Sequence, residues 1–144
     1  MYINETKIKV RYVETDQMGI VHHSNYYPWF EVGRTEFIKE IGMTYSQMEA
    51  ENVMLPLVES SCKYIIGARY EDELTIQTWI EELTGAKVVF KYQVVRDSDS
   101  KIIAKGSTIH AFVNKEFRVM NLKKKNSDMW EKLNALCNKE QVKE

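Results

Sequence analysis

The sequence contains few cysteines and prolines and no excess of charge of either sign. Its 144 residues include two cysteines, two prolines, and 20 Lys and Arg against 21 Asp and Glu. Cys62 and Cys137 are too widely spaced for a zinc motif, and two cysteines make no disulfide framework. A nucleic-acid-binding surface needs a strong basic excess, which this chain lacks. We therefore expect neither a structural zinc site nor a nucleic-acid partner.

Long apolar runs are also missing from the sequence. No stretch approaches the roughly 20 apolar residues that cross a bilayer, so we expect no membrane insertion. The first residues, MYINETKIKVRY, lack the apolar segment of a signal peptide. No repeat or low-complexity linker divides the chain, and its length is typical of one domain. The expectation is a cytoplasmic protein with a single domain over residues 1–144.

The chemically reactive side chains gather in front of an apolar helix, in VETDQMGIVHHSNYYPWFEVGR. Asn25 is expected to cap that helix, Pro28 to lie in its first turn and Gly42 to end it. Gly33, in the middle, suggests that a neighbouring backbone approaches closely. Spacings of three and four place one set of residues on a single helical face: Tyr26, Phe30, Gly33, Phe37 and Ile41.

Most of the remaining chain alternates polar and apolar residues, which predicts strands. In the first strand, Ile8, Val10 and Tyr12 share the buried face. Short polar connections predict an antiparallel meander, and its last strand has a small-residue face suited to packing against a helix. A long helix covering such a sheet gives the α+β class. The expected strands lie within 6–13, 54–67, 73–82, 87–96 and 101–114, with helices within 44–52 and 126–139.

Two segments, TDQMGIVHHSNYYPWFEVGRTEF and YIIGARYEDELTIQTWI, resemble the hotdog-fold acyl-CoA thioesterases. The branch resembled contains 4-hydroxybenzoyl-CoA thioesterase and the small bacterial thioesterases associated with the Tol–Pal system. The resemblance implies a long central helix wrapped by a curved antiparallel sheet of about five strands. It also implies a homodimer or homotetramer, paired edge to edge, with active sites at the subunit interface. The residues in the family's order and spacing are Asp16, Gly19, Val21, His23, Asn25 and Tyr26.

Hydrolysis of a thioester requires a nucleophile or base and donors for the developing oxyanion, but no metal or organic cofactor. The resemblance assigns Asp16 as nucleophile or general base. Taken alone, Asp16 reads as a residue capping the turn before Gly19. The resemblance places His23 beside the thioester, where it would donate a hydrogen bond or assist proton transfer.

Several groups are candidates for binding the acyl-CoA substrate. Asn25 is placed for contact, and free N–H groups at the helix start, around Tyr26 and Tyr27, would polarise the carbonyl. Rival donors are backbone amides of the partner subunit around Glu59, Ser60 and Ser61.

Other polar and aromatic side chains have expected structural roles. Glu14 and His22 are expected at the surface and periphery, and His110 in core or interface packing. The aromatic residues Tyr26, Tyr27, Phe30 and Phe37 are expected mainly in the core.

Three alternatives to an acyl-CoA thioesterase remain open at this point. One is hydrolysis of acyl-carrier-protein thioesters, and another is a non-catalytic acyl-CoA-binding module on the same fold. The third is a dehydratase or isomerase that uses Asp16 with His22 or His23. Thiol release by the native protein, and its loss on Asp16→Asn, would distinguish hydrolysis from binding alone.

Overall fold

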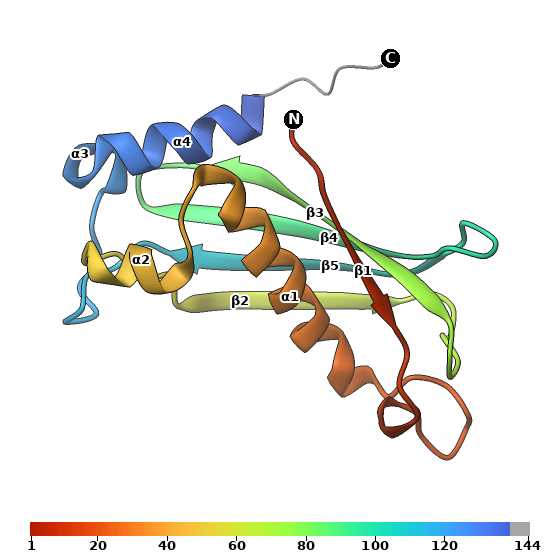
Figure 1. Ribbon diagram of the computed structural model, residues 1–144. Coiled ribbons are helices and arrows are strands. Elements are labelled where there is room, and N and C mark those ends of the chain that lie inside the picture. The colour runs from red at the N-terminus through yellow and green to blue at the C-terminus, as the bar shows by residue number, and fades with distance from the viewer. Residues whose placement is uncertain (139–144) are drawn as a thin grey trace.

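One antiparallel sheet of five strands forms the body of the protein, in the order β1-β3-β4-β5-β2. The computed structural model describes residues 1–138. Helix α1 crosses one face of the sheet (Figure 1). This confirms the α+β architecture, a long helix wrapped by about five strands. The strands are β1 Asn4–Lys9, β2 Leu57–Tyr64, β3 Glu73–Leu83, β4 Lys87–Arg96 and β5 Ile102–Ala111.

The helices begin and end largely where the sequence signals predict. Helix α1, Tyr26–Ile38, continues as a 3-10 turn and ends at Gly42, whose φ of +79° is left-handed. Thr44 caps α2 by accepting a hydrogen bond from the Gln47 N–H, as expected. Lys139, the last residue of the predicted terminal helix, lies outside the described residues. The other helices are α2 Tyr45–Ala50, α3 Leu122–Lys125 and α4 Ser127–Asn138, and 3-10 turns span Tyr12–Glu14, His23–Asn25 and Lys39–Ile41.

The core lies between α1 and the sheet, and the predicted helical face is buried there. Gly33 lies so close to β3 that a Cβ would be 2.5 Å from Thr78 Oγ1. A close approach at Gly33 is therefore present, but it is made by the side chains of Thr78 and Ile76 in β3 and not, as we expected, by a neighbouring backbone. Gly106 of β5 lies against the Phe30 ring.

The first strand is shorter than predicted. The chain leaves β1 after Lys9 and forms a 3-10 turn over Tyr12–Glu14. Tyr12, expected on the buried face, is 73% exposed and packs edge-on against Tyr70. The expectation for Tyr12 was wrong because the turn breaks the two-residue period of the strand.

The predicted meander holds for β3, β4 and β5, which pair in sequence. Strand β2, however, pairs with β5 and not with β3, its neighbour in sequence. As a result β2 forms one edge of the sheet, and Pro56 directly precedes it, as expected of an edge strand. Within residues 1–138, no helix is both long and apolar enough to cross a membrane.

Candidate active site

A hollow of about 300 Å³ lies between the segment before α1 and the end of β2. The residues that line the hollow include one acidic residue, Asp16, and one histidine, His23. Most of the lining residues are apolar or aromatic, so an acyl chain would contact a hydrophobic surface with few polar groups, as is usual in ligand-binding sites. The structure thus brings together Asp16, His23 and Tyr26, three of the predicted site residues. The other lining residues are Met18, Ile20, Val21, Tyr64, Ile65, Ile66 and Gly67.

Asp16 sits in a tight turn whose ends are bridged. Its Oδ1 accepts a hydrogen bond from the Met18 N–H at 2.9 Å, and its N–H donates to the Ile20 carbonyl at 2.8 Å. Gly19 completes the turn at φ +80°, a conformation that glycine adopts without strain. Oδ2 makes no hydrogen bond or ion pair with the described residues. Asp16 therefore caps the turn with one carboxylate oxygen, and the other has no partner among the described residues.

The two adjacent histidines have different surroundings. His22 Nδ1 bonds the Ser24 hydroxyl at 2.8 Å and accepts from the Ser24 N–H at 3.3 Å. The His23 ring lines the hollow and approaches Tyr64 edge-on, with 6.2 Å between ring centroids. The ring makes no hydrogen bond with residues 1–138. His22 is occupied locally, whereas the His23 imidazole remains available to a substrate.

Tyr26 forms the buried wall of the hollow, edge-on to Trp29 and Tyr64. Burial, with smaller effects from Cys62 and Tyr64, raises the pKa of Tyr26 to about 12. The phenol is therefore neutral at physiological pH and can donate a hydrogen bond. Burial also raises the pKa of the free Cys62 thiol, which keeps it protonated and disfavours a thiolate nucleophile.

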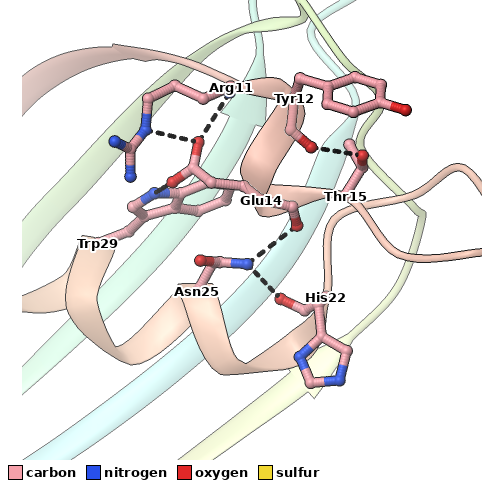
Figure 2. Close-up of polar contacts among 7 residues, drawn as sticks. All are labelled: Arg11, Tyr12, Glu14, Thr15, His22, Asn25 and Trp29. Atoms are coloured by element: carbon pink, nitrogen blue, oxygen red, sulfur yellow. Dashed lines mark hydrogen bonds and ion pairs between the residues drawn. The ribbon is translucent and has the colours of Figure 1, made fainter.

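Asn25 occupies the N-cap position of α1, as predicted, but its side chain does not make the expected capping hydrogen bond. It is helical itself, because a 3-10 turn over His23–Asn25 precedes α1. Its side-chain Nδ2 instead donates to the carbonyls of Glu14 at 3.0 Å and His22 at 3.1 Å (Figure 2). Asn25 is not among the residues that line the hollow, and it fixes backbone next to them.

The same 3-10 turn changes which helix-start amide is free. The Tyr26 N–H, expected to be free, donates to the His23 carbonyl. The His23 N–H donates to no described residue. The available amide donor thus lies one turn earlier than the sequence suggested.

Glu14 is buried, not at the surface as expected. The residue is 5% exposed, and its carboxylate accepts the Trp29 indole N–H at 3.1 Å (Figure 2). The 3-10 turn after β1 rotates Glu14 inward, so its position cannot be read from strand alternation. A signal existed in Trp29, since a buried indole N–H usually finds an acceptor.

The remaining predicted residues lie away from the hollow. Glu59, Ser60 and Ser61 are exposed on β2, opposite Ile109, Thr108 and Ser107 of β5. Within one chain they do not reach Asp16, and their predicted role concerns the partner subunit. Tyr27 is 38% exposed, so its assignment to the core was wrong. Its ring lies at the edge of the core, edge-on to Phe30 with 5.9 Å between ring centroids, and is partly open to solvent.

His110 is buried at 2% exposure, in line with its expected packing role. Burial, assisted by Arg34, lowers its pKa to about 4, against a raising effect of its bond to the Leu55 carbonyl. His110 is thus neutral and takes no part in the hollow. Among residues 1–138, no three His, Cys, Asp or Glu side chains cluster closely enough to hold a metal ion.

A family model described as the thioesterase-like superfamily matches residues 10–135. The chain belongs to this superfamily. The match spans most of the chain, including the hollow, and confirms the resemblance to the hotdog thioesterases.

Individual relatives agree with the family assignment. YneP of Bacillus subtilis, provisionally named an acyl-CoA thioesterase, is 40% identical over 116 residues, 81% of this chain and 83% of that protein. YbgC of Escherichia coli O6:H1, named an acyl-CoA thioester hydrolase, is 32% identical over 88 residues, 61% of this chain and 66% of that protein. A crystal structure of the DHNA-CoA thioesterase of Staphylococcus aureus superposes with a TM-score of 0.87 at 28% identity, covering 99% of this chain and 98% of that one.

Proposed function

We propose that this protein hydrolyses acyl-CoA thioesters to a carboxylic acid and free CoA, with Asp16 as nucleophile or general base. The observation that carries the proposal is Asp16, which lines an apolar hollow and whose carboxylate Oδ2 has no partner among the described residues. A binding module would not need an unengaged carboxylate among apolar walls. The names of the relatives point to the same substrate class.

The reaction needs one group to start it and one to complete it. Asp16 either removes a proton from an attacking water or attacks the carbonyl carbon itself, giving an anhydride that water then hydrolyses. In both routes the C–S bond breaks and the electron pair leaves on the CoA sulfur. In this proposal His23, which lines the same hollow, hydrogen-bonds the thioester and delivers a proton to the departing thiolate.

Charge that develops on the carbonyl oxygen requires a donor. The His23 N–H is our first candidate, because it is unused and precedes the N-terminus of α1. The neutral Tyr26 hydroxyl is a second candidate donor at the wall of the hollow.

We also propose that two copies pair along β2. Within residues 1–138 only one side of β2 is paired, and the strand exposes Leu57, Val58 and Tyr64 at 55%, 65% and 47%. An unpaired apolar edge of this kind is a template for another strand. Two-fold antiparallel pairing would bring the start of the partner's β2 towards the end of this one, where the hollow lies. This would carry the predicted donors Glu59, Ser60 and Ser61 of one subunit towards the site of the other.

Asp16→Asn tests the catalytic assignment without disturbing the turn, since the amide oxygen can still accept from the Met18 N–H. Thiol release should be measured over short, long and aromatic acyl-CoA substrates. We expect turnover to fall by about 10²- to 10⁴-fold, the usual contribution of a general base, with an unchanged melting temperature. Asp128→Asn, on the exposed side of α4, is the matched control and should retain full activity.

Different results would favour different functions. Release from acyl-carrier-protein thioesters alone would support that substrate class, and binding of acyl-CoA without release would support the binding module. Full activity of Asp16→Asn would refute the role of Asp16. The expectation of a cytoplasmic protein is tested separately by cell fractionation.

A further inference from the structure

We infer that Glu14 is a positioning residue. It holds residues 15–23, the segment that carries Asp16 and His23, in place against helix α1. The kinetic part of this inference rests on the proposed function, and the structural part does not. Glu14 itself does not line the hollow. It acts at the base of the segment, through both its side chain and its backbone carbonyl.

The Glu14 side chain ties the segment to two elements. Oε2 accepts the Trp29 indole N–H at 3.1 Å, and Oε1 accepts the Arg11 backbone N–H at 2.8 Å (Figure 2). The Arg11 guanidinium Nε lies 3.5 Å from Oε1 and balances the charge. A carboxylate this deeply buried is stable only when its oxygens are hydrogen-bonded. Glu14 is therefore fixed relative to α1 and to the 3-10 turn that begins after Arg11.

The Glu14 backbone carbonyl closes the segment from the other end. It accepts the His22 N–H at 2.8 Å and Asn25 Nδ2 at 3.0 Å. Figure 2 shows the side chain and the carbonyl reaching opposite ways, towards Trp29 and towards Asn25. One residue thus joins the start of the segment, its end and the first turns of the helix.

This arrangement controls both reactive groups of the proposed site. Asp16 follows Glu14 by two residues in a turn closed by the Thr15–Val21 bridge, and His23 follows the bonded His22. If the Glu14 contacts are weakened, the turn can shift relative to Tyr26 and the wall of the hollow. A shift of about 1 Å in a reacting group can lower a rate by about 10²-fold.

Two acceptor oxygens explain why a carboxylate stands at this position. Each oxygen faces an N–H donor, from Trp29 on one side and Arg11 on the other. A glutamine fits the same space but has one acceptor oxygen, so its NH₂ group would face a donor. Glu14→Gln is therefore a sharp test, because it preserves volume and removes only one acceptor.

The chain offers a matched control for the partner residue. Trp29→Phe removes the indole donor of the Glu14 contact. Trp130→Phe removes a similar indole bond, from Nε1 to the Thr84 carbonyl at 3.0 Å. The two tryptophans are equally buried, at 6% and 7% exposure. Figure 1 shows α4, which carries Trp130, at the end of the molecule away from the segment before α1.

Two measurements on the full chain test the inference. Backbone amide hydrogen exchange over residues 15–22 reports the order of the segment whether or not the protein is active. We expect exchange there to become about tenfold faster in Glu14→Gln and Trp29→Phe, and unchanged in Trp130→Phe. Below the melting temperature of each variant, kcat should fall about tenfold or more with KM nearly constant, since orientation and not binding is lost. Trp130→Phe should keep its kcat.

The outcomes separate this inference from the proposed function. Unchanged exchange in both site variants would overturn it, and so would faster exchange with kcat values equal to that of Trp130→Phe. The double variant Glu14→Gln/Trp29→Phe tests whether the two residues act together. If its loss in kcat equals the combined losses of the two single variants, Glu14 and Trp29 do not act through a shared hydrogen bond, and the inference fails. If the native protein releases no thiol, the proposed function fails, and exchange alone decides whether Glu14 holds the segment.

Discussion

The ring of Phe30 in α1 lies directly against the backbone of Gly106 in β5, where a Cβ atom would overlap it. Phe30 is fully buried and stacks on Tyr92 with 4.5 Å between ring centroids. The helix can approach the sheet this closely only because one strand residue has no side chain. This contact fixes the depth of α1 on the sheet, and the start of α1 carries the candidate site.

Gly106→Ala is therefore expected to destabilise the protein. Alanine for glycine in a strand usually stabilises, but here the added methyl group must displace a packed ring. We expect a loss of about 1–3 kcal/mol, typical of overpacking, measured as a shift in the urea midpoint. Ser107→Ala, one residue along the same strand, should change it little. Phe30→Leu in the Gly106→Ala background should recover part of the loss by making room, and no recovery would argue against this contact.

The contact at Gly106 also shows what the sequence could predict. The buried face of α1, its end at Gly42 and the cap at Thr44 depend on residues within one or two turns of each other. Such local patterns are readable without a structure. The small-residue face around Gly106 indicated a close helix, but not that Phe30 would be the residue in contact.

Features that depend on distant partners were not predictable. Glu14 meets Trp29 fifteen residues away, after a turn that breaks strand alternation. The pairing of β2 with β5 skips over two strands, and short connections reveal only neighbours in sequence. The candidate residues Asp16 and His23 were identified through resemblance, whereas the hollow that both of them line arises from the fold.

Stability should fall between pH 7 and pH 5 because of His110. Its Nδ1 lies 3.0 Å from the Leu55 carbonyl and Nε2 lies 2.9 Å from Thr108 Oγ1. A carbonyl only accepts, so Nδ1 carries the proton and Nε2 accepts from Thr108. In the folded state the pKa is lowered to about 4 from an ordinary 6.5, so protonation favours unfolding. The stabilisation from neutral His110 is complete above pH 6.5 and is lost as the pH falls towards 4. By pH 5 the loss in the free energy of unfolding is on the order of 2 kcal/mol.

Urea unfolding at pH 7 and pH 5 measures this effect. In His110→Gln the free energy of unfolding should be lower than in the native protein at both pH values, and it should differ less between pH 7 and pH 5. The exposed Asp99 does not interfere, because its pKa is lowered to about 2 by Arg96 and its stabilisation is lost only below about pH 4. An equal pH dependence in native protein and His110→Gln would contradict the assignment.

Tyr26→Phe should separate catalysis from folding. The Tyr26 hydroxyl bonds no described residue, and its ring contacts with Trp29 and Tyr64 do not need the oxygen. The melting temperature should therefore remain unchanged. If the neutral phenol donates to the substrate, kcat/KM falls by about 5- to 20-fold, the value of one hydrogen bond of about 1–1.8 kcal/mol. Unchanged kcat/KM would remove Tyr26 from the proposed donors and leave the His23 N–H.

Pairing along β2 predicts that one charge on this strand changes the size of the particle. Val58→Lys places a cation on the free edge, a common device by which proteins prevent edge pairing. Light scattering should show a multiple of 17.0 kDa for the native protein and a shift towards 17.0 kDa for the variant. Glu5→Lys adds the same side chain on β1, the other edge of the sheet, and should leave the mass unchanged. Because the partner's Glu59–Ser61 would complete the site, thiol release should fall with the mass. A fully active monomer would show that each hollow works alone.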